Sequence, residues 1–204
     1  PYHLMTWDRH QDPSLLRNYL TKASHVWLAI SDSAIIPFYE KHLEGHDFKV
    51  ICFSGAISDR RLIFAHPLMT FTENLYDDSF YSQIYFALTN CENLSEALPE
   101  FPNQSFYVKA ESKAFYHALC VVAGNFPQLL WNEVYQHAHV HHFPEKGFDL
   151  YLQAVVNNFI QLKKSAITGP FIRKDYTTVD QNIKALDQTS MGEIYKTFKK
   201  EFLP

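Results

Sequence analysis

Lys113 and His117 are the side chains best suited to chemistry, because they stand one helical turn apart in an otherwise apolar stretch. That stretch, residues 110–131, has the three- and four-residue apolar spacing that predicts a long helix. At about 100° per residue, both side chains share a stripe roughly 80° wide with Cys120, Gly124 and Gln128. An ammonium and an imidazole on one stripe could exchange protons with a ligand in a cleft. Alternatively, they mark the exposed beginning of a core helix.

Polar residues follow three short apolar runs, at 2–7, 25–30 and 48–53, which are typical of strands. These polar residues are Asp8, Arg9, Ser31, Asp32, Ser54 and Gly55. In open parallel sheets, ligands bind beyond the carboxyl ends of the strands, so we expect all six to contact a nucleotide cofactor. Asp8 would suit a ribose and Arg9 a 2′-phosphate, which leaves NAD and NADP both open. The alternative is ordinary loop and capping chemistry.

Two further segments could contact a substrate. His66, followed by Pro67 and Thr70, could donate a hydrogen bond or a proton to a carbonyl group. Thr168 and Arg173, which flank a Gly-Pro pair, could bind an anion through backbone donors and a guanidinium group. The alternatives are a structural turn at His66 and an ion pair between Arg173 and Asp175 that braces the second loop.

Four histidines lie between His137 and His142, and His137 and His141 are one helical turn apart. This spacing suits two imidazole ligands of one ion, but the sequence offers no evident third ligand. Cationic side chains are also favoured near helix C-termini. We therefore expect a solvated helix end there and predict no metal site.

Composition excludes several classes of protein. The chain of 204 residues has a formal net charge of -4 and a hydrophobic share of 47%, which predicts a folded core and no nucleic-acid partner. It contains no apolar run of the roughly 20 residues that cross a membrane. Its three cysteines are odd in number and widely spaced, which favours a reducing, cytoplasmic environment.

Apolar runs alternate with helical periodicity up to about Ala110, and helical periodicity dominates afterwards. The pattern predicts an α/β domain with a parallel sheet over residues 1–110, followed by an all-α domain over 111–204. The sequence contains no Gly-x-Gly-x-x-Gly loop. If residues 2–7 form the second strand of a dinucleotide fold, the first strand and its glycine loop are missing.

Four ordered motifs then resemble a known family. They are Ser54-Gly-Ala56, His66-Pro-Leu-Met-Thr-Phe71, Lys113-x-x-Tyr-His117 with Asn125, and Thr168-Gly-Pro-x-x-Arg-x-Asp175. Together they resemble proteins with a Rossmann-like N-terminal domain and a DUF2520 C-terminal domain. Those proteins belong to the superfamily of 6-phosphogluconate dehydrogenase, ketopantoate reductase and pyrroline-5-carboxylate reductase. The sequence departs from the family pattern at Met69, where Gln is common, and at Lys174, where Gly is common.

The resemblance implies an NAD(P)-dependent oxidoreductase that acts on a small carbonyl or imine compound. It implies that Lys113 polarises the reacting group, with His117 and Asn125 beside it as further catalytic residues. The substrate-binding residues would then be His66, Thr70, Thr168 and Arg173. It also implies a homodimer joined through the helical domain. The alternative is a non-catalytic dimeric ligand-binding or scaffold protein that has lost the dinucleotide loop.

Overall fold

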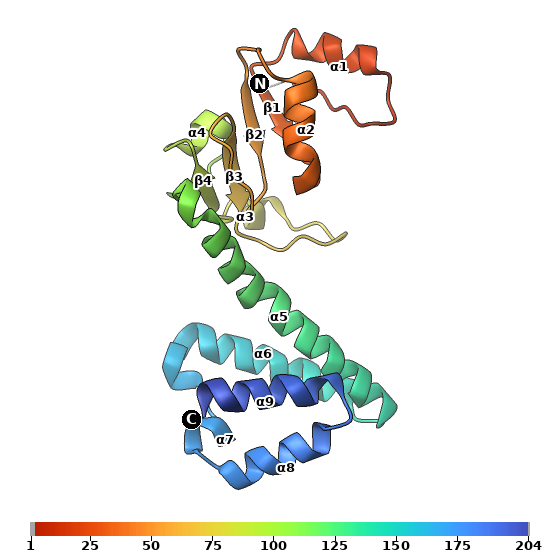
Figure 1. Cartoon of the computed structure of the whole chain (residues 1–204), viewed down its shortest axis with the longest axis vertical. Helices are drawn as coiled ribbons and strands as arrows, with labels where there is room; N and C mark the ends of the chain where they lie inside the picture. Colours follow the sequence, from red (N-terminus) through yellow and green to blue (C-terminus); the bar gives the residue numbers. More distant parts are fainter. Residues whose placement is uncertain (1–2, 204) are drawn as a thin grey trace. The chain divides into compact units, whose positions relative to one another are not determined.

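The computed structural model describes residues 3–203 (Figure 1). The first part of the chain contains α1 (Pro13–Leu20), β1 (His25–Leu28), α2 (Asp32–His42), β2 (Lys49–Cys52), β3 (Ile63–Pro67), α3 (Asp78–Tyr81), β4 (Phe86–Thr89), α4 (Leu94–Ala97) and β5 (Ser105–Tyr107). A short 3-10 helix at Ala110–Ser112 leads into α5 (Lys113–Val140). The remaining helices are α6 (Glu145–Leu162), a 3-10 turn at Lys163–Ala166, α7 (Pro170–Arg173), α8 (Tyr176–Leu186) and α9 (Ser190–Phe202). The predicted α/β domain followed by a helical region is confirmed.

The five strands form one sheet in the order β1-β2-β3-β4-β5. Strands β1, β2 and β3 are parallel, with Trp27 opposite Ile51 and Cys52 opposite Phe64. Strand β4 runs antiparallel to β3, and β5 is parallel to β4. The carboxyl ends of β1, β2 and β3 therefore lie at one edge of the sheet, which is where the sequence predicts a ligand site.

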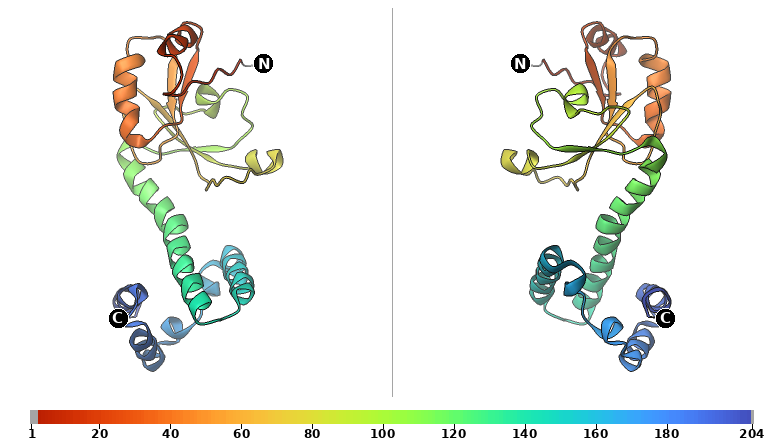
Figure 2. Two further views of the ribbon diagram at one scale, coloured as in Figure 1. Left: turned by 90° about the vertical axis from the view of Figure 1, so that its right-hand side faces the viewer. Right: turned by 90° about the vertical axis from the view of Figure 1, so that its left-hand side faces the viewer.

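Alternate residues of the central strands face two separate apolar cores. Val50, Cys52 and Phe64 pack with Ile35 of α2 on one face of the sheet. On the other face, Ile51 and Ala65 pack in a cluster that also includes residues of β4 and α4. Both side views in Figure 2 show α2 and α4 on opposite faces of the sheet. Central strands covered on both faces explain why the sequence there is continuously apolar.

The strand predicted at residues 2–7 is wrong for its described part, since residues 3–7 form no strand. Tyr2 lies outside the described residues. The Leu4 side chain is 73% exposed, and no neighbouring strand pairs with this segment among residues 3–203. An extended segment without a paired neighbour leaves its N–H and C=O groups to water, so its apolar pattern alone does not make it a strand.

The chain folds as two compact units, the first ending at Gly124 and the second beginning at Asn125. The division falls inside α5, later than the 110/111 boundary predicted from the sequence. Pro127 lies three residues beyond Gly124 and has no N–H to donate to the carbonyl group of the preceding helical turn. Among the described residues, none of the helices combines the length and apolar character needed to cross a membrane.

Candidate active site

Gly55 and two imidazole rings converge at the carboxyl edge of the sheet in the first unit. A methyl group placed on Gly55 would lie 2.5 Å from Cδ2 of His117 and 2.8 Å from Nε2 of His66. The ring centroids of His66 and His117 are 6.0 Å apart, and their planes are nearly perpendicular. Because real Cβ atoms do not approach other atoms this closely, only glycine lets the backbone lie against both rings.

The parallel pairing of β2 and β3 produces this convergence. Gly55 belongs to the loop that follows β2, and His66 is the penultimate residue of β3. In that loop, the buried Ser54 hydroxyl oxygen accepts hydrogen bonds from the backbone N–H groups of Ala56 at 3.2 Å and Ile57 at 3.3 Å. His117 comes from the first turns of α5. The three sequence motifs that contain these residues therefore meet in space within one compact unit.

Lys113, the first residue of α5, holds the same loop through its side chain. This side chain is only 2% exposed, and Nζ donates hydrogen bonds to the carbonyl oxygens of Ser54 and Ile57, both at 2.7 Å. The ammonium group also lies 3.5 Å from the ring centroid of Phe64. Burial lowers the pKa of Lys113 to about 8, whereas the carbonyl oxygens and the aromatic face favour the charged form. We therefore treat Lys113 as an ammonium ion at neutral pH.

His66 is held in a neutral form beside this charge. Burial lowers its pKa to about 4, and the neighbouring His117 and Lys113 act in the same direction. Its Nδ1 atom lies 3.0 Å from the hydroxyl oxygen of Tyr116. A neutral imidazole with one nitrogen engaged presents its other nitrogen to a ligand as a single donor or acceptor.

Asp32, the first residue of α2, adds a negative charge to the site. It follows β1 closely, with Ser31 as the N-cap of α2. Its charge opposes the effect of burial on the pKa of both Lys113 and His66. Three of the strand-end residues predicted to bind a cofactor belong to this site. Ser54 accepts a hydrogen bond from Lys113, and Gly55 lies against the rings of His66 and His117. Asp32 acts on Lys113 and His66 through its charge.

Other predicted residues of the first unit lie in exposed loops. Asp8 and Arg9 form an exposed turn in which an Asp8 carboxylate oxygen accepts from the N–H of His10 at 2.8 Å. Thr70 is exposed, and its carbonyl oxygen accepts from the hydroxyl group of Tyr76 at 3.1 Å. The hydrogen bond within the exposed turn is of the kind expected from the loop and capping alternative for Asp8 and Arg9.

Asn125, Thr168 and Arg173 belong to the second unit, where all three are exposed. Arg173 lies in the last turn of α7, and the Asp175 carboxylate caps α8 by accepting from the N–H of Thr178 at 3.1 Å. Lys174 has a φ angle of 56°, in the left-handed region that glycine adopts without steric cost. This conformation gives a physical reason why glycine is common at that position in the resembling family.

Sequence reasoning missed the role of Tyr116. It belongs to the Lys113-x-x-Tyr-His117 motif and lies three residues after Lys113, a spacing that places both side chains on neighbouring parts of the helix surface. That spacing could have identified Tyr116 as part of the site. Nothing in the sequence identifies the carbonyl groups of Ser54 and Ile57, because every residue has a carbonyl group and only the fold directs these two at Lys113.

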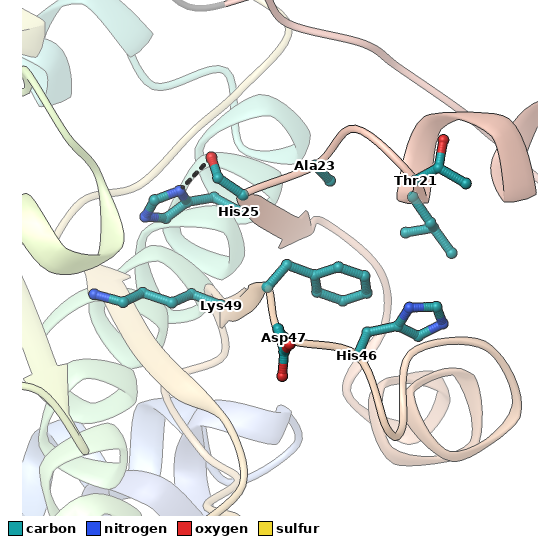
Figure 3. Close-up of a pocket in the computed structure, with 9 residues that line it drawn as sticks. Thr21, Ala23, His25, His46, Asp47 and Lys49 are labelled. Carbon is teal, nitrogen blue, oxygen red and sulfur yellow. Dashed lines mark hydrogen bonds between the residues drawn. The ribbon is translucent and has the colours of Figure 1, made fainter.

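A hollow of about 520 Å³ lies elsewhere in the first unit, at the amino ends of β1 and β2 (Figure 3). His25, His46 and Lys49 are among the residues that line it. Figure 3 shows His25 and Lys49 extending to one side and His46 to the other, so their polar atoms do not converge. Within residues 3–203, no three or more His, Cys, Asp or Glu side chains are grouped so as to hold a metal ion. The convergent polar groups at Gly55 are therefore the better candidate site.

Protonation of His66 should make stability depend on pH. Since the pKa of His66 falls from 6.5 to about 4 on folding, the unfolded chain binds a proton between these values that the folded chain does not. The free energy of unfolding should therefore decrease as the pH falls from about 6.5 towards 4. In urea unfolding at pH 7 and pH 5, His66→Gln should lose part of this decrease, whereas His3→Gln, at an exposed histidine, should keep it. Equal pH dependence in His66→Gln and the unsubstituted protein would contradict the buried, neutral imidazole.

Replacing Lys113 should loosen the loop that carries Gly55. Lys113→Met removes the ammonium group that donates to the carbonyl groups of Ser54 and Ile57, so the loop should open more often. Hydrogen exchange of the Ala56 and Ile57 amides should accelerate about tenfold relative to the β2 amides, which report global unfolding. Lys49→Met, at a half-exposed lysine, is the matched control. The loop does not depend on Lys113 if the Ala56 and Ile57 amides accelerate no more than those of β2.

Solved structures with a similar fold include the following two. Protein TM1727 from Thermotoga maritima matches with a TM-score of 0.69 and 21% identity, over 86% of this chain and 74% of that chain. The protein named putative NADP oxidoreductase BF3122 from Bacteroides fragilis matches with a TM-score of 0.72 and 18% identity, over 88% of this chain and 75% of that chain. No curated protein sequence matches the chain.

The family model described as "Domain of unknown function (DUF2520)" matches residues 87–202. The match includes the last two strands of the sheet, the Lys113 to His117 motif and all of the helices that follow. It covers more than half of the chain and agrees with the motifs found in the sequence. The chain therefore belongs to the DUF2520 family.

Proposed function

We propose that the protein is an NAD(P)-dependent oxidoreductase that acts on a small carbonyl or imine compound at the carboxyl edge of its sheet. One observation carries the proposal: Gly55 lies against the rings of His66 and His117 where the parallel strands end. In open α/β sheets this edge is where nucleotides and substrates meet. The fold shared with a protein named as an NADP oxidoreductase supports it.

The residues present fit the nicotinamide half of such a cofactor. Ser31, Asp32 and Ser54 supply polar groups at neighbouring strand ends, and the rings of His66 and His117, which lie against Gly55, are proposed to border the nicotinamide ring. The diphosphate half has no Gly-x-Gly-x-x-Gly loop in this sequence to bind it. Asp8 and Arg9 are the candidates of this chain for the ribose end.

The side chains of the site then take distinct roles. Nicotinamide, when bound, supplies or accepts the hydride. His117 is proposed to exchange the accompanying proton, because its ring borders Gly55 beside the ring of His66. Lys113 is proposed to act by holding the Ser54 to Ile57 loop, since its ammonium group already donates to two carbonyl groups. Thr70 remains a proposed substrate contact, and the roles of Asn125, Thr168 and Arg173 in the second unit remain predictions from the family resemblance.

A second candidate function is ligand binding without catalysis. The sequence observation that favours it is the absence of the glycine loop, which normally brings backbone donors to the diphosphate. Such a protein would keep the Gly55 site for a small ligand but would not retain a dinucleotide. Binding of the intact cofactor distinguishes the two functions.

Calorimetric titration of the whole chain with NADPH and with NADH tests the proposed function. Saturable binding in the micromolar range is expected for at least one cofactor. Gly55→Ala should weaken it at least tenfold, because its methyl group displaces the two imidazole rings from the cofactor edge. Gly124→Ala, where an added methyl group meets nothing within 4 Å, should bind like the unsubstituted protein. Absence of binding at millimolar NADPH and NADH would refute the oxidoreductase and leave the ligand-binding alternative.

We further propose that the chain forms a homodimer through its helical unit. Helix α6 has 18 residues and none of them is buried. Its apolar side chains include Val155, Phe159 and Ile160, which are 44%, 50% and 59% exposed. Apolar surface of this extent on one helix is typical of an interface between subunits. A second copy of the same surface is apolar as well and could cover it.

Sedimentation equilibrium tests this assembly. The unsubstituted protein should be dimeric at micromolar concentration, and Phe159→Glu should shift it towards the monomer, because a carboxylate would be buried in an apolar interface. Gln161→Glu adds the same charge at an exposed polar position of α6 and should leave the dimer intact. A monomeric unsubstituted protein, or a dimeric Phe159→Glu variant, would contradict this interface.

A further inference from the structure

Tyr116 is the member of the cluster that has no role in the proposed reaction. We infer that its hydroxyl group donates a hydrogen bond to Nδ1 of His66 and thereby keeps the proton of this imidazole on Nε2, beside Gly55. Tyr116 is then a positioning residue that acts through His66. The catalytic meaning of this role rests on the proposed function, whereas the tautomer itself does not.

The geometry supports a direct contact of this kind. The Tyr116 hydroxyl oxygen and Nδ1 of His66 are 3.0 Å apart, and the two rings meet edge to face with centroids 5.7 Å apart. The ring of Phe106 in β5 also meets the Tyr116 ring edge to face, with centroids 5.9 Å apart. The tyrosine ring is therefore held by a neighbour on the sheet while its hydroxyl group meets the imidazole.

Two arrangements of the shared proton are chemically distinct. Either the phenol donates to an unprotonated Nδ1, or a protonated Nδ1 donates to the phenol oxygen. A phenol O–H is more acidic than the N–H of a neutral imidazole, and the imidazole nitrogen is the better acceptor. Burial also raises the pKa of Tyr116, so the hydroxyl group keeps its proton. The phenol has one proton to donate, and the imidazole nitrogen is a stronger acceptor than the sulfur of the nearby Cys120. The phenol is therefore the donor.

This hydrogen bond decides whether the other nitrogen of the His66 ring, Nε2, carries the proton. Nε2 would be only 2.8 Å from a methyl group on Gly55, so this nitrogen lies close to the Gly55 backbone. A neutral imidazole that carries its proton there donates a hydrogen bond and does not act as a base. His66 would hold a carbonyl or carboxamide oxygen of a ligand, which leaves the exchange of protons to His117.

Nuclear magnetic resonance of the whole chain labelled with ¹⁵N-histidine at pH 7 tests the inference without any cofactor. The His66 signals are assigned by their loss in His66→Gln, and the correlation of ring protons with both nitrogens shows which nitrogen is protonated. We expect protonated Nε2 and unprotonated Nδ1 in the unsubstituted protein. In Tyr116→Phe, the Nδ1 resonance should shift as the accepted hydrogen bond is lost, and the other tautomer should become detectable.

Tyr107→Phe is the matched control, because it removes a hydroxyl group from an exposed tyrosine of β5. It should leave the His66 signals unchanged. The inference is overturned if Nδ1 carries the proton in the unsubstituted protein. It is equally overturned if Tyr116→Phe changes the His66 signals no more than Tyr107→Phe does. Failure to bind NADPH or NADH would remove the proposed reaction and leave this result intact, so the two failures are distinguishable.

Discussion

The first unit depends on the buried ammonium group of Lys113. Removing a cation from water costs several kcal/mol in a protein, and here two carbonyl oxygens at 2.7 Å and the face of Phe64 replace the lost hydration. Hydrogen bonds to a charged group contribute about 1.5–3 kcal/mol each, and a desolvated aromatic face about 2 kcal/mol. These gains are of the same order as the cost. The ammonium group therefore joins the start of α5 to the loop after β2 without leaving an uncompensated charge.

The arrangement of the candidate site follows from that attachment. Because the first residue of α5 is hydrogen-bonded to the loop after β2, Tyr116 and His117 lie at the carboxyl edge of the sheet, next to His66 of β3. The glycine at position 55 lets the rings of His66 and His117 lie against the backbone. Burial then keeps His66 neutral. The attachment of Lys113 to this loop thus accompanies the placing of His117 next to His66 at one edge of the sheet.

Helix α6 of the second unit exposes more apolar side chains than the sheet of the first unit does. The sheet of the first unit is covered on both faces, whereas α6 buries none of its residues despite its apolar composition. Surface of this kind costs free energy while it faces water, by roughly 25 cal/mol for each Å². This cost is the physical basis for the proposed association of two chains. It also explains why apolar periodicity alone does not distinguish a helix of the core from a helix of an interface.

The sequence by itself determined the α/β sheet, the long helix, the family and the three motifs that meet at Gly55, because apolar periodicity and short motifs are local properties of the chain. It misplaced a strand at residues 3–7, since strand formation needs a neighbour that periodicity does not reveal. Only the tertiary structure decided that Lys113 is buried against two carbonyl groups and that Tyr116 contacts His66. These contacts join residues about 50 or more positions apart, and their geometry depends on the register of β2 against β3, which no local pattern specifies.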